Sequence, residues 1–238
     1  MFMKIILVDE RISPLCERSL LKLGFYVIKM PPDRDLGPAV ASHPDTLAFF
    51  CDGELITTAD YCDTAAYIFS ELRELCSSLK ISFTSDKRGG RYPEDCKMNA
   101  LVIDKRIFCK SDSISDAILD FAKRRGYEVI HTNQGYPACT VLAFGNSAIT
   151  ADRGIAGVLE NSGVKVTLID AGHISLPPHE YGFIGGASFV FGNRVFFFGD
   201  ITTHPDGEKI LRVISESGFT PVSLSDEELS DLGGAIVI

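Results

Sequence analysis

Cys139 is the residue of this sequence best placed to act as a nucleophile. It follows Gly135 and precedes an apolar run, at a boundary between two of the repeating units described below. A thiol attacks carbon only as a thiolate, so Cys139 needs a positive group or a helix N-terminus nearby to lower its pKa. Cysteine is also among the most buried residue types, and the alternative is that Cys139 only packs in the core.

Two histidines lie in loops at comparable unit boundaries. His43 is two residues before Asp45, and His173 follows Asp170 at the end of an expected strand. A histidine near a carboxylate can exchange protons near neutral pH. The candidate catalytic residues are therefore Cys139, His43 and His173, and Asp45 and Asp170 are candidate ligand-binding residues. The alternatives are that the histidines are solvated and that Asp45 only stabilises a turn.

Aspartates recur after the second strand in four of the five expected units, at Asp9, Asp60, Asp152 and Asp200. Helix N-capping is the ordinary explanation for such a position. The alternative is that the aspartates attract a cationic ligand, which makes Asp152 and Asp200 further candidate ligand-binding residues.

The sequence predicts neither a metal site nor a cofactor. His173, His179 and Asp170 are close in sequence, but their spacing supplies no third or fourth ligand for zinc from another loop. The glycine runs match neither the phosphate-loop pattern nor the dinucleotide-binding pattern.

The composition predicts a soluble, globular, cytoplasmic protein. The 238 residues are 45% hydrophobic and 23% charged, with a formal net charge of -9, which disfavours nucleic acid as a partner. No apolar run approaches the roughly 18 residues of a membrane span, so no membrane partner is expected. The seven cysteines form no CxxC pair, and no signal peptide or glycosylation sequon is evident, as is typical of reduced thiols. A small-molecule ligand is expected, and the oligomeric state is not predicted.

The elements expected to position these residues form a β-β-α-β unit that repeats along the chain. In three units a two-residue turn joins two apolar runs, at Asp104–Lys105, Gly145–Asn146 and Gly192–Asn193. A helix that ends at a glycine follows, and then a third apolar run. The approximate units are residues 1–45, 46–98, 99–139, 140–187 and 188–235.

The first unit lacks the first strand of its hairpin, and residues 236–238 can supply it. These residues are apolar and follow Gly233–Gly234, where the other units begin their first strand. Pairing of this closure strand with residues 5–8 would join the two ends of a ring and leave few exposed sheet edges. We therefore expect an α/β fold, a five-bladed β/α propeller that forms a single domain over residues 1–238. The alternative is an ordinary α/β sandwich with similar segments.

Five β-β-α-β units with Gly-Gly before a new unit resemble the pentein superfamily, the β/α propeller fold of guanidine-modifying enzymes such as arginine deiminase and dimethylargininase. Residues 43–49 look like the His-x-Asp-Thr segment of the deiminases, and residues 135–139 and 182–187 look like a bacterial family of unknown function with this fold. The resemblance implies a nucleophilic cysteine, a histidine that transfers protons, and carboxylates that hold a guanidinium group.

The sequence departs from these enzymes at the position of their nucleophile. Their cysteine lies just beyond the final Gly-Gly, here Gly233–Gly234, and residues 235–238 contain no cysteine. The standard chemistry of the superfamily is therefore not expected. We predict a protein that binds a small cationic guanidino or amino ligand in the central mouth of the ring, with hydrolase-like activity at an unusual Cys/His site as an extension. The alternative is a non-enzymatic binding or scaffold module, because the fold also occurs in a ribosome anti-association factor.

Overall fold

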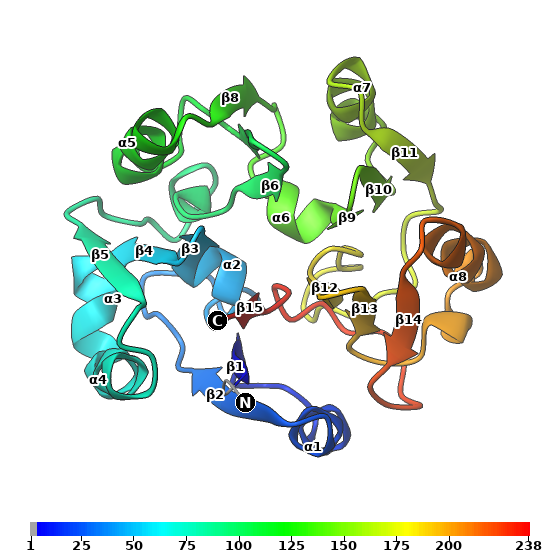
Figure 1. Cartoon of the computed structure of the whole chain (residues 1–238), viewed down its shortest axis with the longest axis horizontal. Coiled ribbons are helices and arrows are strands. Elements are labelled where there is room, and N and C mark those ends of the chain that lie inside the picture. The colour runs from blue at the N-terminus through cyan, green and yellow to red at the C-terminus, as the bar shows by residue number, and fades with distance from the viewer. Residues whose placement is uncertain (1–3) are drawn as a thin grey trace.

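The computed structural model describes residues 4–238, which form five three-stranded sheets arranged around a common centre (Figure 1). In every sheet the middle strand pairs antiparallel with one neighbour and parallel with the other. This is an α/β fold, and the five sheets match the five predicted units. Residues 1–3 of the predicted first unit lie outside the described residues.

The strands follow the predicted β-β-α-β order. Their bounds are β1 Lys4–Asp9, β2 Phe25–Met30, β3 Ala48–Cys51, β4 Glu54–Thr58, β5 Lys80–Thr84, β6 Leu101–Ile103, β7 Arg106–Cys109, β8 Glu128–His131, β9 Leu142–Phe144, β10 Ser147–Thr150, β11 Lys165–Leu168, β12 Ser188–Phe191, β13 Arg194–Phe197, β14 Thr220–Ser223 and β15 Ile236–Val237. The three predicted two-residue turns lie between β6 and β7, β9 and β10, and β12 and β13. Asp104 and Gly145 have positive φ in these turns, which is why Asp and Gly suit them.

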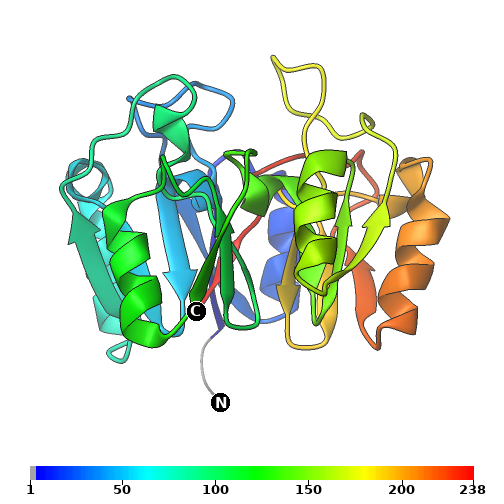
Figure 2. The same ribbon diagram turned by 90° about the horizontal axis from the view of Figure 1, so that it is seen from above.

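The longer helices lie on the outside of the sheets, and the long loops rise together on one side of the molecule (Figure 2). The helices are α1 Pro14–Lys22, α2 Pro44–Leu47, α3 Ala59–Thr64, α4 Ala66–Leu75, α5 Asp116–Arg125, α6 Pro137–Thr140, α7 Arg153–Asn161 and α8 Gly207–Glu216, with short 3-10 turns η1 Glu94–Cys96 and η2 Ile201–Thr203. The short α2 and α6 each precede an inner strand, so they lie near the centre. Among residues 4–238, no helix is long and apolar enough to cross a membrane.

The two terminal strands pair as predicted. β15 runs antiparallel to β1, with Leu7 opposite Ile236 and Ile6 opposite Val237. The backbone amide of Ile5 also donates to the carbonyl oxygen of Ile238 at 3.2 Å. β15 therefore supplies the hairpin strand that the first unit lacks, and the sheet of β1 and β2 gains a third strand.

Deletion of residues 235–238 should lower the melting temperature by roughly 10 °C. The deletion removes the buried Ile236 and exposes an edge of β1, at a cost of at least about 3 kcal/mol in the free energy of unfolding. Thermal unfolding followed by circular dichroism measures the shift. The control is Leu21→Ala, which truncates a side chain that is 54% exposed and should change stability by no more than about 0.5 kcal/mol. An unchanged melting temperature of the deletion variant would contradict the role of β15.

Candidate active site

A cavity of about 710 Å³ lies among the long loops and reaches His43, Cys139 and Asp231. Its wall is largely apolar and includes four aromatic side chains, Tyr92, Tyr136, Tyr181 and Phe183. The rings of Tyr92 and Tyr136 are 6.1 Å apart, and those of Tyr181 and Phe183 are 6.4 Å apart. Such a concave, mostly apolar pocket with a few convergent polar groups is typical of a small-molecule site.

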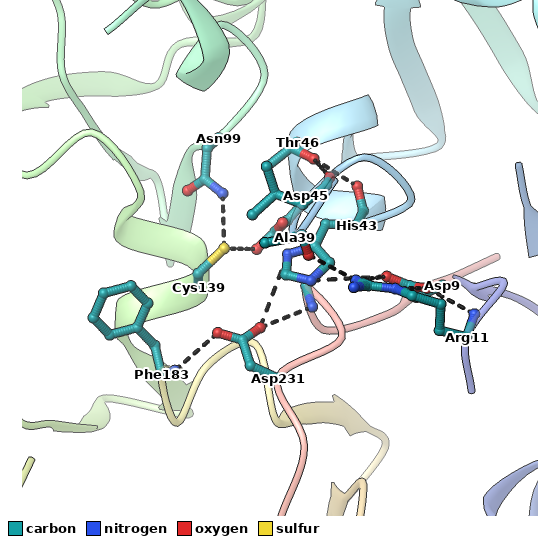
Figure 3. A network of polar contacts seen from close by, with 12 residues as sticks. Asp9, Arg11, Ala39, His43, Asp45, Thr46, Asn99, Cys139, Phe183 and Asp231 are labelled. Carbon is teal, nitrogen blue, oxygen red and sulfur yellow. Dashed lines mark hydrogen bonds and ion pairs between the residues drawn. The ribbon is translucent and has the colours of Figure 1, made fainter. Parts of the chain in front are cut away.

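Cys139 and Asp45 meet beside this cavity (Figure 3). Cys139 lies in α6 and is buried, and its Sγ donates a hydrogen bond to Asp45 Oδ2 at 2.6 Å. Asp45 lies in α2, where a proline at the first helical position sets the backbone for a single helical turn. Two short helices from different units therefore bring a thiol and a carboxyl group into direct contact.

Asn99 fixes the position of α6 and of the thiol. Its Nδ2 donates to Cys139 Sγ at 3.3 Å, and its Oδ1 accepts a hydrogen bond from the amide of Ala138 at 2.8 Å. The side chain of Asn99 is fully buried. A buried amide with both ends bonded in this way holds one orientation, so the Cys139 side chain is rigidly positioned.

His43 lies beside the thiol of Cys139, and its side chain is fully buried. Its Nε2 is 3.7 Å from Asp9 Oδ2, and its Nδ1 is 3.9 Å from Asp231 Oδ1. Neither ring nitrogen has a hydrogen-bond partner among residues 4–238. Burial lowers the pKa of His43 to about 4, because the neighbouring carboxylate of Asp9 only partly offsets the loss of solvent. The imidazole is therefore neutral at physiological pH.

Asp9 is held in place by Arg11. Its Oδ1 accepts hydrogen bonds from the backbone amide and the Nε of Arg11, at 2.8 and 2.9 Å, and its Oδ2 accepts one from Nη2 at 2.6 Å. The same guanidinium nitrogen donates to the carbonyl oxygen of Ala39 in the loop before His43. The hydrogen bond to Asp9 raises the pKa of Arg11. This pair therefore links the end of β1 to the loop that carries His43.

Asp231 is a second buried carboxyl group beside His43. It accepts hydrogen bonds from the amides of Phe183, at 2.8 Å, and Gly233, at 3.0 Å. Burial raises its pKa to about 6 in spite of these donors. The backbone can approach Asp231 and His43 this closely only at glycine residues. A Cβ at Gly186 would collide with the Asp231 carboxyl group, and a Cβ at Gly233 would collide with His43.

Burial also controls the protonation of Cys139 and Asp45. Burial raises the pKa of Asp45 to about 8 and raises the pKa of the Cys139 thiol well above its usual value. The negative charge of ionised Asp45 raises the pKa of the thiol further. A reactive thiol needs a positive group that lowers its pKa, and the structure places the carboxyl group of Asp45 beside Cys139 instead. The free protein therefore holds a protonated thiol at neutral pH.

The structure brings together His43, Asp45 and Cys139, but it does not place His173 with them. His173 is exposed, and its ring centroid lies 5.6 Å from that of His204. Asp170 is exposed as well. These two residues follow β11, and their contacts are with the fifth unit: the backbone amide of Asp170 donates to Asp206 Oδ2 at 2.7 Å.

Two of the remaining candidates are helix caps. Asp152 accepts hydrogen bonds from the amides of Gly154 and Ile155 at the start of α7. Asp200 accepts one from the amide of Thr202 at the start of η2. Their side chains satisfy backbone donors at the helix ends, which agrees with the capping alternative.

Sequence reasoning did not single out Asn99, Arg11 and Asp231. Asp9 was expected to cap a helix or to attract a cationic ligand, whereas α1 is capped by Ser13 and Asp9 binds Arg11. Their position within the repeating unit could have identified two of them, because Asn99 and Asp231 both lie just before an inner strand, as His43 and Cys139 do.

His43, Asp45 and Cys139 also form a group of metal-ligating side chains, with one ligand atom from each lying within 4.8 Å of the others.

Solved structures with a similar fold are enzymes of the pentein superfamily. DDAH from Pseudomonas aeruginosa, in a complex with citrulline, has a TM-score of 0.58 and 12% identity, over 95% of this chain and 93% of that one. SxtG, an amidinotransferase from Microseira wollei, has a TM-score of 0.55 and 12% identity, over 94% and 88% of the two chains. Agmatine deiminase of C. jejuni has a TM-score of 0.53 and 8% identity, over 94% and 87% or 86% of the chains in two structures. At these identities the likeness establishes the fold.

The chain belongs to DUF6873, a family of unknown function whose sequence pattern matches residues 7–236. No curated protein gives a significant match. The predicted resemblance to the pentein superfamily, and to a family of unknown function with this fold, is confirmed.

Asp45 should destabilise the fold increasingly as the pH rises from about 4 to about 8. Its pKa is about 8 in the folded protein and near 4 in the unfolded chain, so within this window only the unfolded chain loses the proton. The free energy of unfolding should fall by up to about 1.4 kcal/mol per pH unit from this group. Asp45→Asn removes this dependence. Urea unfolding at pH 5 and pH 8 should therefore show the variant gaining stability relative to wild type.

The matched control is Asp63→Asn, at an exposed position outside the cluster. Its stability difference from wild type should be the same at both pH values. Parallel pH profiles for wild type and Asp45→Asn would show that Asp45 does not hold a proton in the folded state.

Proposed function

We propose that this protein binds a small cationic molecule with a guanidino or amino group in the cavity over His43, Cys139 and Asp231. One observation carries the proposal: the described cavity wall contains the carboxyl groups of Asp95, Glu180 and Asp231 and no lysine or arginine. A cavity with acidic groups and no basic side chain favours a positively charged occupant.

Asp231 is the carboxyl group of this cavity that a cationic ligand would stabilise most in its ionised form. Its carboxyl group is buried, and desolvation raises its pKa to about 6. A cation close to Asp231 would favour the ionised form and provide charge-assisted hydrogen bonds. The aromatic side chains of Tyr92, Tyr136 and Tyr181 line the same space and suit a cation or its apolar stem. The proteins of similar fold include an amidinotransferase and an agmatine deiminase, which are consistent with a guanidino compound.

Asp231→Asn should weaken the binding of agmatine by about 10-fold or more, because the amide keeps the size of the side chain but loses its charge. Isothermal titration calorimetry on the metal-free protein measures the affinity, with citrulline as a ligand that carries an uncharged urea group. Asp200→Asn is the control, since Asp200 is a helix cap and asparagine caps equally well. Equal affinity of wild type and Asp231→Asn, or no preference for agmatine over citrulline, would contradict the proposal.

A hydrolase-like activity at Cys139 is the second candidate, and the hydrogen bond from Cys139 to Asp45 favours it. With Asp45 ionised, its carboxylate can accept the thiol proton as sulfur forms a bond to the amidine carbon of a bound ligand. The same proton is then available to the amine that leaves when its bond to that carbon breaks. A cationic ligand would also lower the pKa of the thiol, which the free protein keeps high. If Cys139 is inert, the protein is a binding module of the same fold.

A cationic electrophile should therefore label Cys139 faster than a neutral one. We expect 2-chloroacetamidine to modify Cys139 at least about 10-fold faster than 2-chloroacetamide at pH 7.5, relative to their rates with free cysteine. Peptide mass spectrometry locates the adduct. Cys51, a buried thiol that donates to Tyr127 Oη at 3.2 Å, is the internal control. Equal rates at Cys139 and Cys51 would favour the binding module.

The proposal treats residues 1–238 as one domain with the closed five-bladed ring expected from the sequence. Pairing of β1 with β15 supports the closure, as does the packing of Phe25 against Phe189 and Phe196 between the first and fifth units. The seven cysteines are all free, which supports a reducing compartment such as the cytoplasm.

A further inference from the structure

Three side chains of different metal-ligating types converge beside the cavity. His43, Asp45 and Cys139 come from two units, and one ligand atom of each lies within 4.8 Å of the others. Figure 3 shows Cys139 and Asp45 in contact and the ring of His43 beside them, with its nitrogens facing Asp9 and Asp231. We propose that they form a binding site for a tetrahedral transition-metal ion of the Zn²⁺ class, with the fourth coordination position open to the cavity.

The donor set selects the class of metal. A thiolate, an imidazole and a carboxylate are the ligands that Zn²⁺ uses in proteins, whereas Mg²⁺ and Ca²⁺ take oxygen ligands. At Zn bond lengths of about 2.0–2.3 Å, tetrahedral ligand atoms lie about 3.5 Å apart. Cys139 Sγ and Asp45 Oδ2 are 2.6 Å apart around a proton, so the pair must separate by about 1 Å. The S–H bond of Cys139 and the O–H bond of the Asp45 carboxyl group break, both protons pass to solvent, and sulfur–metal and oxygen–metal bonds form in their place.

The unpartnered polar atoms of the cluster point independently to a missing partner. Both ring nitrogens of His43 and the Oδ1 of Asp45 are buried without a hydrogen bond from the part of the chain that the structure describes. Buried polar groups are nearly always bonded, so three such atoms in one cluster require an explanation. A metal ion would take one lone pair from the imidazole and one from the carboxylate.

The surroundings of His43 also fit a metal ligand. Its two ring nitrogens face the carboxyl groups of Asp9 and Asp231, at 3.7 and 3.9 Å. Whichever nitrogen binds the metal, the other can therefore donate its proton to a carboxylate, the usual supporting contact of a metal-bound histidine. Asp9 is already fixed by Arg11, and Asp231 by the amides of Phe183 and Gly233. These contacts form the supporting shell of the site.

The metal has a route to its ligands, because His43 and Cys139 line the cavity. Three protein ligands and one open position are the arrangement of a catalytic or regulatory zinc site, whereas a structural site has four. The inference does not rest on the proposed organic ligand. Both occupants would be positively charged and would contact the same residues, so the metal should exclude the organic cation.

The test uses the reduced full-length protein after treatment with a chelator and its removal, with Co²⁺ and Zn²⁺ as probes and no organic ligand present. We expect one equivalent of Co²⁺ to give a thiolate-to-metal charge-transfer band and tetrahedral visible absorption, both displaced by Zn²⁺. Cys139→Ser should abolish the charge-transfer band. It should also weaken Zn²⁺ binding by at least about 100-fold, measured by competition with a colorimetric chelator.

The matched control is Cys51→Ser, which removes another buried thiol and should leave the cobalt spectrum unchanged. If circular dichroism shows that Cys139→Ser does not fold, His43→Gln keeps the thiol and should still weaken Zn²⁺ binding by about 10-fold or more. The inference is overturned if wild type gives no thiolate band, if the band survives in Cys139→Ser, or if Cys51→Ser also loses it. Agmatine titration of the same metal-free protein tests the proposed function separately, because agmatine can bind whether or not the protein binds a metal ion.

Discussion

Burial of ionisable groups around His43 is the constraint on which the rest of the site depends. Removing a charge from water costs several kcal/mol, so each buried group must be paired or neutral. Asp9 has the guanidinium of Arg11 beside it, and Asp231 accepts hydrogen bonds from two backbone amides. His43 and Asp45 lack such partners, and burial shifts the pKa of each toward its neutral form.

The same constraint determines the backbone around the cluster. Carboxyl groups in the interior need donors within hydrogen-bond distance, and the nearest donors are the amides of adjoining loops. Those loops can approach closely only where side chains are absent, as at Gly186, next to Asp231, and at Gly233, next to His43. Gly233–Gly234 therefore does more than begin the last strand, because it lets the chain pass over the imidazole before β15 pairs with β1.

With Cys139 and Asp45 protonated, the thiol is a poor nucleophile until a cation binds beside it. A bound organic cation would favour ionised Asp231 and a lower pKa of Cys139, and a metal ion would replace the protons of Cys139 and Asp45. Both proposals thus follow from one property, the shortage of positive charge beside buried acidic groups. The fold is shared with guanidino-modifying enzymes, but here the thiol lies at the boundary between the third and fourth units.

The sequence by itself determined the repeating architecture. Turn residues, helix-ending glycines and apolar runs are local signals, so the hairpin turns, the order of elements and the pairing of residues 236–238 with β1 were all predictable. It also identified His43, Asp45 and Cys139 as candidates, because their residue types suit chemistry and they lie at boundaries between repeating units. Only the tertiary structure decided which boundary residues meet: Asn99, Asp9, Arg11 and Asp231 join the cluster, and His173 does not. Desolvation depends on atoms far apart in the chain, and for this reason the sequence could not reveal that burial and Asp45 keep the Cys139 thiol protonated.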